Sequence, residues 1–149
     1  MKLDELLTEE QVEKEAKASA KRALAVSVKH WEQAVAMTPE DLCKASAWDG
    51  GFDVSDLLCG LCQRYFDSQE RITSAGTGCS KCPLARAGSI CITPIDSREE
   101  CASVWWKASI AYDDLFHSGL PCPKKKWSAW QRAAKAMLKK LKALKEPRK

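Results

Sequence analysis

The stretch that decides the fold is CGLCQRYFDSQERITSAGTGCSKCPLARAGSIC, which runs from Cys59 to Cys91 and contains five of the eight cysteines. Its first four cysteines form two Cys-x2-Cys pairs, Cys59/Cys62 and Cys79/Cys82, with 16 residues between the pairs. Two cysteines at this spacing can turn both sulfurs toward one ion, and two such pairs complete a tetrahedron. Because four thiolates leave no open coordination position, the pattern predicts a structural rather than a catalytic zinc site.

Two alternatives remain open for these thiols. Cys82-Pro83 is similar to the end of some ferredoxin cysteine runs, and Cys91 supplies a fifth thiol, so an iron–sulfur cluster is possible. The cysteines could also be buried without any ligand. If zinc is bound, Cys91 could replace one of the four ligands, and His30 is a weaker substitute. We expect His30 to lie on the surface or at the boundary of a helix.

The glycines beside the two pairs suit the tight turns that such a site needs. Gly60 lies inside the first pair, and Gly76 and Gly78 precede the second. The stretch from Gly76 to Lys81 lacks the adjacent Gly-Lys-Ser/Thr of a phosphate-binding loop, so it does not indicate nucleotide binding.

Upstream of this segment the sequence predicts one long helix over residues 8–37. Thr8 and Gln11 fit a capping box, and no glycine or proline interrupts the chain before Pro39. Apolar residues recur at steps of three and four along this range: Val12, Ala16, Ala20, Ala23, Leu24, Val28, Trp31 and Val35. A short helix follows Thr38 and should bury Leu42 and Cys43.

Residues 49–96 form an irregular, cysteine-rich segment in which a short helix or turn over about 57–66 should carry the first pair. Another helix should begin near 96 and end at Gly119. A last helix is expected over about 125–145, with an apolar stripe of Trp127, Trp130, Ala134, Met137, Leu141 and Leu144. The sequence thus predicts a single, mostly α-helical domain over 1–149, whose irregular centre is stapled by zinc.

The charge is distributed unevenly. Residues 1–121 carry 13 Lys/Arg and 19 Asp/Glu, whereas residues 122–149 carry 11 Lys/Arg and one acid. The basic amphipathic helix in 122–149 could pack its apolar stripe on the core, bind nucleic-acid phosphates, or dock an acidic protein surface, including the acidic body of this chain. The candidate binding residues are Lys124, Lys125, Lys126, Arg132, Lys135, Lys139 and Lys140.

Several classes of protein are disfavoured. No apolar run reaches the roughly 20 residues of a membrane span, so we expect no membrane partner. The acidic amino terminus lacks the apolar region of a secretory signal, which places the protein in a reducing cytoplasm. The two histidines, His30 and His117, lie in no recognisable catalytic motif, so we do not expect an enzyme.

Three features together resemble a diffuse group of small cysteine-rich proteins of tailed bacteriophages. They are Lys29-His30-Trp31, the Cys59/Cys62 pair, and Gly78-Cys79-Ser80-Lys81-Cys82-Pro83-Leu84 followed by Cys91. The resemblance covers about residues 28–93 and excludes the basic last helix. It implies a metal-binding accessory protein made in the cytoplasm of an infected bacterium.

The resulting functional hypothesis is a zinc-stabilised binding module that engages a host macromolecule, most simply a host protein, and inhibits or redirects it. The alternatives are a non-specific nucleic-acid-binding protein that uses the basic helix, and an iron–sulfur redox or sensing protein.

Overall fold

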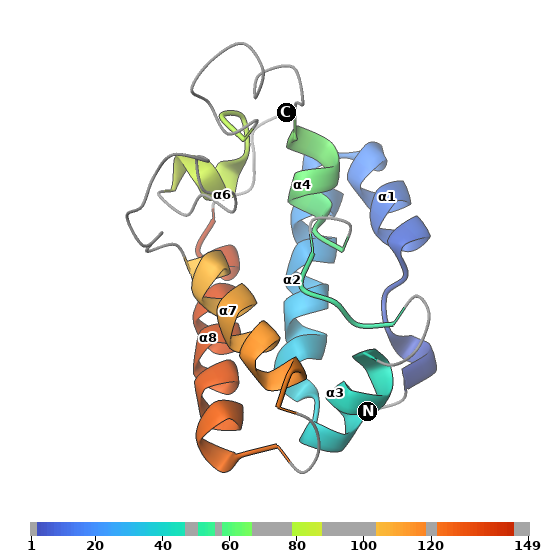
Figure 1. Cartoon of the computed structure of the whole chain (residues 1–149). Coiled ribbons are helices and arrows are strands. Elements are labelled where there is room, and N and C mark those ends of the chain that lie inside the picture. The colour runs from blue at the N-terminus through green and yellow to red at the C-terminus, as the bar shows by residue number, and fades with distance from the viewer. Residues whose placement is uncertain are drawn as a thin grey trace.

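The computed structural model describes residues 3–46, 51–55, 58–66, 79–87, 104–118 and 122–144. Within these ranges every regular element is a helix, which confirms the prediction of a mostly α-helical fold (Figure 1). The elements are the 3-10 helix η1 (Leu3–Glu5) and the α-helices α1 (Glu9–Ala18), α2 (Ala20–Ala36), α3 (Pro39–Ser46), α4 (Gly60–Tyr65), α6 (Pro83–Arg86), α7 (Val104–Phe116) and α8 (Lys124–Lys142).

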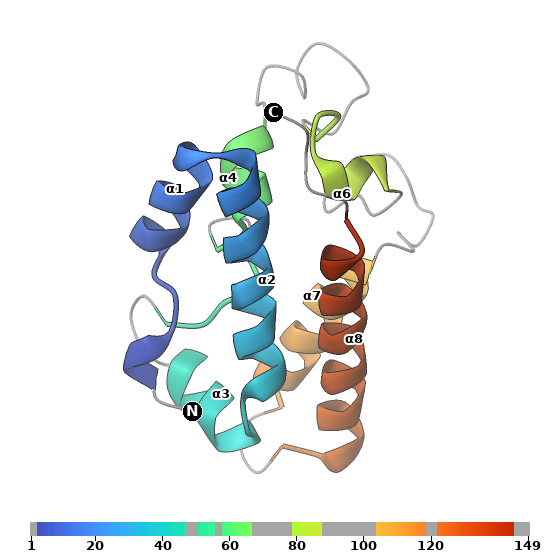
Figure 2. The ribbon, with the colours of Figure 1, turned by 180° about the vertical axis from the view of Figure 1, so that it is seen from behind.

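The prediction of one continuous helix over 8–37 is wrong. The helix is interrupted at Ser19, whose backbone is extended and whose hydroxyl accepts a hydrogen bond from the N–H of Arg22. Serine is a favoured helix N-cap, so it can start a second helix without a glycine or proline. The break lets α1 fold back alongside α2 as a helical hairpin (Figures 1 and 2). The capping box of Thr8 and Gln11 at the start of α1 is confirmed.

The hydrophobic core surrounds α2, which packs on α1, α4 and α8, and α8 packs in turn on α7 (Figure 2). Trp31 of α2 and Trp130 of α8 are both buried, with ring centroids 6.2 Å apart. Ala134, Met137 and Leu141 continue the same stripe of α8 and are fully buried, so the last helix packs on its own core as one of the three interpretations predicted. Trp127 and Leu144, at the edge of the stripe, are half-buried.

The short helix α3 confirms one predicted core residue and corrects another. Leu42 is buried, but Cys43 is exposed. Leu42 and Ala45 lie three residues apart and therefore share the inner face of α3, while Cys43 is rotated about 100° away from Leu42. Cys43 is thus an accessible thiol rather than a core residue.

The predicted short helix near 57–66 corresponds to α4, and the helix expected to end at Gly119 corresponds to α7, which ends at Phe116. The start of that helix near 96, together with Gly76, Gly78 and Cys91, lies outside the described residues. Both views place α4 and α6 at the same end of the molecule, opposite α3 (Figures 1 and 2). This end contains the two cysteine pairs.

Candidate metal centre

The four cysteines of the two pairs are all buried in one hydrophobic cluster. Their exposed fractions are 4% for Cys59, 8% for Cys62, 4% for Cys79 and 4% for Cys82. Each pair is attached to the start of a short helix. Cys59 is the N-cap of α4 and Cys62 lies in its first turn, while Cys82 is the N-cap of α6 and follows a turn closed by a 2.9 Å hydrogen bond from its N–H to the carbonyl of Cys79.

The pair at α6 also explains the Cys-Pro dipeptide. Pro83 occupies the first position of α6, directly after its N-cap. Proline suits this position because its fixed φ matches the helix and its missing N–H would have no partner there. Helix initiation therefore gives the proline of Cys82-Pro83 a structural role.

Two of the thiols, those of Cys59 and Cys82, have raised pKa values. A hydrogen bond with the Cys62 side chain, together with burial, raises the pKa of Cys59 well above its ordinary value. Burial likewise raises the pKa of Cys82, and a smaller contribution comes from the charge of Cys59. Without a metal, Cys59 and Cys82 are therefore protonated thiols at neutral pH.

This arrangement is not a closed metal site. In the part of the chain that the structure describes, no three His, Cys, Asp or Glu side chains are placed so that they could hold a metal ion together. The structure therefore buries both predicted pairs in the core, on helices at the same end of the molecule, and the zinc site is a proposal. The alternative ligand Cys91 lies outside the described residues.

The first pair is held in place by a buried serine of α2. The hydroxyl of Ser27 donates to the carbonyl of Ala23 at 2.9 Å and accepts from the N–H of Leu61 at 3.1 Å. It also lies 4.0 Å from the Sγ of Cys59. Either group can be the donor in that weak contact. Sequence reasoning missed Ser27, which is a polar residue on the inner face of α2.

Gly60 serves a different purpose from the predicted one. A Cβ at this position would lie 2.5 Å from the carbonyl oxygen of Ala23 and would also collide with the side chain of Val26. Gly60 is needed because α4 approaches the backbone of α2 too closely for any side chain, and not because a turn requires it.

Arg64 connects the other end of α4 to α1. Its Nη1 donates to the carbonyl of Ala16 at 2.8 Å, and the carbonyl of Lys17 lies at 3.5 Å. These carbonyls belong to the last turn of α1, where a cation satisfies unpaired acceptors and opposes the negative end of the helix dipole. The segment with the first cysteine pair is thus fastened to both helices of the α1–α2 hairpin.

His30 is a core residue, so its predicted position at a helix surface is wrong. It is 3% exposed, and its ring stacks on Phe52 with centroids 4.8 Å apart and an interplanar angle of 9°. Burial lowers the pKa of His30 to about 4, against a smaller opposing effect of a backbone hydrogen bond to Asp53. The sequence did contain a signal, because Ala23, Ser27, His30 and Ala34 recur at helical spacing and all are buried.

The predicted basic residues of α8 divide into two groups. Lys124, Lys125, Arg132, Lys135 and Lys139 are exposed, and Lys126 and Lys140 are half-buried. Lys126 lies 3.9 Å from Asp114 of α7, and Lys142 pairs with Glu32 of α2 at 2.7 Å. The other predicted cations have no ion-pair partner among the described residues. The basic helix thus docks partly on the acidic body and leaves a cationic face to solvent.

Comparisons with models of protein families, with curated protein sequences and with solved structures found no match to this chain. Among the helices described here, none has the length and apolar character needed to cross a membrane.

Proposed function

We propose that the protein is a zinc-stabilised binding module that engages a host macromolecule, most simply a host protein, and inhibits or redirects it. The observation that carries this proposal is the burial of all four cysteines of the two Cys-x2-Cys pairs in the hydrophobic core. Two pairs at this spacing supply the four thiolates of a structural zinc site.

The short helices beside the pairs explain why a metal would be useful there. Helix α4 has six residues and α6 has four, and isolated helices of that length are unstable in water. A metal held by both pairs would join these two short helices and so stabilise them. Because the thiols must lose their protons to bind zinc, the affinity should increase with pH.

The proposed site favours binding over catalysis, since a zinc ion with four thiolates has no position for a substrate or water. The resemblance of residues 28–93 to small phage proteins supports the same proposal, because such proteins often act by binding to host machinery. The protein would then work in the cytoplasm of an infected bacterium.

The test is the metal content of protein purified without added chelator. We expect a colourless protein with one zinc per chain by elemental analysis. A brown protein that contains iron and sulfide would instead support the iron–sulfur alternative, and a folded protein without metal would overturn both metal proposals. The zinc-loaded protein, immobilised and exposed to bacterial lysate, should then retain a specific host partner.

A second candidate function is non-specific nucleic-acid binding, favoured by the exposed cations of α8. Its affinity would fall steeply with added salt, because bound phosphates release counterions. Removal of α8 is not a usable test, since Trp130 and Met137 of this helix belong to the core. Charge reversal at Lys125 and Lys135, which are exposed, should abolish a gel shift if this face binds nucleic acid.

A further inference from the structure

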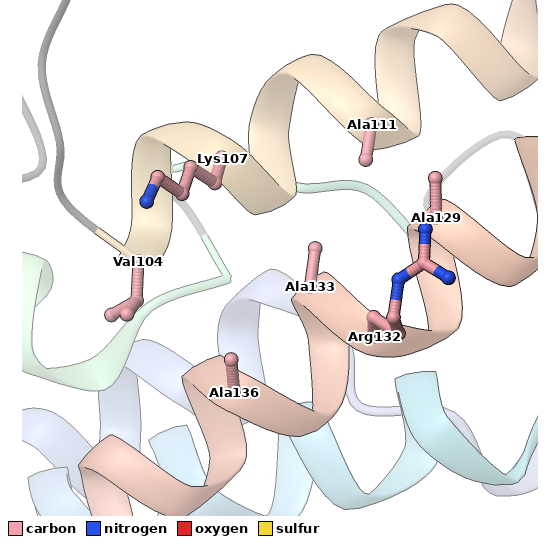
Figure 3. A pocket seen from close by; sticks show the side chains of 7 residues that line it. All are labelled: Val104, Lys107, Ala111, Ala129, Arg132, Ala133 and Ala136. Carbon is pink, nitrogen blue, oxygen red and sulfur yellow. The ribbon is translucent and has the colours of Figure 1, made fainter.

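An open groove of about 350 Å³ lies between α7 and α8 (Figure 3). Its apolar lining consists of Val104 and Ala111 of α7 and of Ala129, Ala133 and Ala136 of α8. Figure 3 shows these short side chains directed into the space between the two helices. Residues this small leave room for another backbone to approach closely, as happens where helices pack through alanine and glycine.

The alanines of α8 form a row along the helix. Positions 129, 133 and 136 are spaced by four and three residues and so share one face. The row extends over seven residues, which corresponds to about 10 Å along the helix axis. A partner helix lying in the groove could therefore place about two turns against it.

Cations border this apolar row. Lys107 of α7 and Arg132 of α8 line the groove itself, and neither has an ion-pair partner among the described residues. The exposed Lys125 and Lys139 extend the positive charge along α8, on the solvent side of the alanine row. The groove thus presents an apolar strip beside a positively charged strip.

We propose that this groove binds an acidic amphipathic helix of a partner protein. Such a helix would place apolar side chains on the alanines and its carboxylates beside Arg132 and Lys107, in the helix-in-groove mode of recognition. The proposal rests on the proposed function as a binding module and specifies its surface. A nucleic acid is the weaker fit, because phosphates would engage the cations and leave the apolar row uncovered.

The test uses the full-length zinc-loaded protein and a fluorescent synthetic peptide about five helical turns long. Leucines at helical spacing form one face of the peptide, and glutamates form the adjacent face. A second peptide has the same composition in scrambled order, so it keeps the charge but loses the apolar stripe. We expect fluorescence anisotropy to show at least about tenfold tighter binding of the amphipathic peptide.

Variants locate the binding site. Ala136→Glu places a carboxylate in the groove at an exposed position, and Arg132→Glu reverses one of its cations. Each should weaken binding of the amphipathic peptide about tenfold. The matched controls are Ala25→Glu on α2 and Lys14→Glu on α1, which change the net charge equally at exposed positions outside the groove. Both controls should bind the peptide like the wild type.

Three outcomes would overturn the proposal: no binding of the amphipathic peptide, equal affinity for the scrambled peptide, or equal weakening by the controls. Tight binding of a DNA duplex by a protein that does not bind the peptide would assign the face to nucleic acid. Zinc is quantified in the same samples, so the two proposals are tested separately. A protein that contains zinc but does not bind the peptide would contradict only the proposal that the groove binds a helix. A protein that binds the peptide but contains no metal would contradict only the proposal of a zinc site.

Discussion

The hydroxyl of Ser27 accepts a hydrogen bond from the backbone N–H of Leu61 at 3.1 Å, which joins the middle of α2 to the first turn of α4. Both residues are almost completely buried. The first N–H groups of a helix have no partner within the helix, so a side chain from another element must satisfy them when water is excluded. The position of the first cysteine pair therefore depends on a residue 32 positions before Cys59 in the sequence.

Replacement of Ser27 by alanine should destabilise the protein by about 1–3 kcal/mol, because the N–H of Leu61 would remain buried without an acceptor. The measurement is the free energy of unfolding from urea denaturation. Ser128→Ala is the matched control, since Ser128 is exposed on α8 and such substitutions usually change stability by less than about 0.5 kcal/mol. Equal denaturation midpoints for the two variants would show that the Ser27 contact contributes nothing.

A methyl group at position 60 should also destabilise the folded protein. Gly60→Ala would bring its Cβ to 2.5 Å from the carbonyl oxygen of Ala23 and into contact with Val26, so α4 would have to move away from α2. Overpacking of this kind costs about 1–3 kcal/mol. In the background of Val26→Ala, which removes the side-chain collision but not the one with the backbone, Gly60→Ala should cost less than in the wild type and still destabilise the protein. No cost of Gly60→Ala in that background would mean that the backbones of α4 and α2 are not in close contact.

Helix positions were the most predictable part of this fold. The stripe of Trp130, Ala134, Met137 and Leu141 is a local pattern, and local periodicity suffices to predict which face of a helix is buried. The break at Ser19 was missed because serine is tolerated inside helices and favoured at their starts. Only the antiparallel packing of α1 on α2 decides between these two roles.

The candidate site was less predictable, because its supports come from distant parts of the chain. The spacing of the cysteines picks out the two pairs, and all four side chains are buried. Nothing local distinguishes Ser27 from other serines or reveals that Gly60 lies against Ala23. The burial of His30 likewise depends on Phe52, which lies in the segment after α3 and stacks its ring on the imidazole of His30.

The buried His30 predicts that the protein loses stability in mild acid. The folded state holds the pKa of His30 at about 4, below its ordinary value of 6.5, so between these values the unfolded chain binds more protons. The contribution of the neutral, buried His30 to the free energy of unfolding is constant above pH 6.5. It is lost as the pH falls toward 4, at up to about 1.4 kcal/mol per pH unit. The total loss over this range is on the order of 3 kcal/mol.

His30→Gln removes the titrating group and keeps a polar side chain of similar length. Loss of zinc in acid would affect both proteins, so the informative quantity is the difference between their unfolding free energies as a function of pH. We expect this difference to be constant above pH 6.5 and to shift in favour of His30→Gln as the pH decreases to 4. A difference that does not change with pH would contradict the low pKa of His30.

The last prediction concerns the metal. If zinc links the two pairs, a strong chelator should lower the melting temperature of the wild type, because a ligand that binds only the folded state stabilises it by about 4 kcal/mol at a thousandfold excess over Kd. Cys62→Ser should melt at a similarly reduced temperature and should not respond to the chelator. Cys43→Ser is the matched control, since Cys43 is exposed and should melt like the wild type and keep its sensitivity to the chelator. A wild type whose melting is the same with and without chelator, and only slightly above that of Cys62→Ser, would mean that Cys59, Cys62, Cys79 and Cys82 act as buried core thiols.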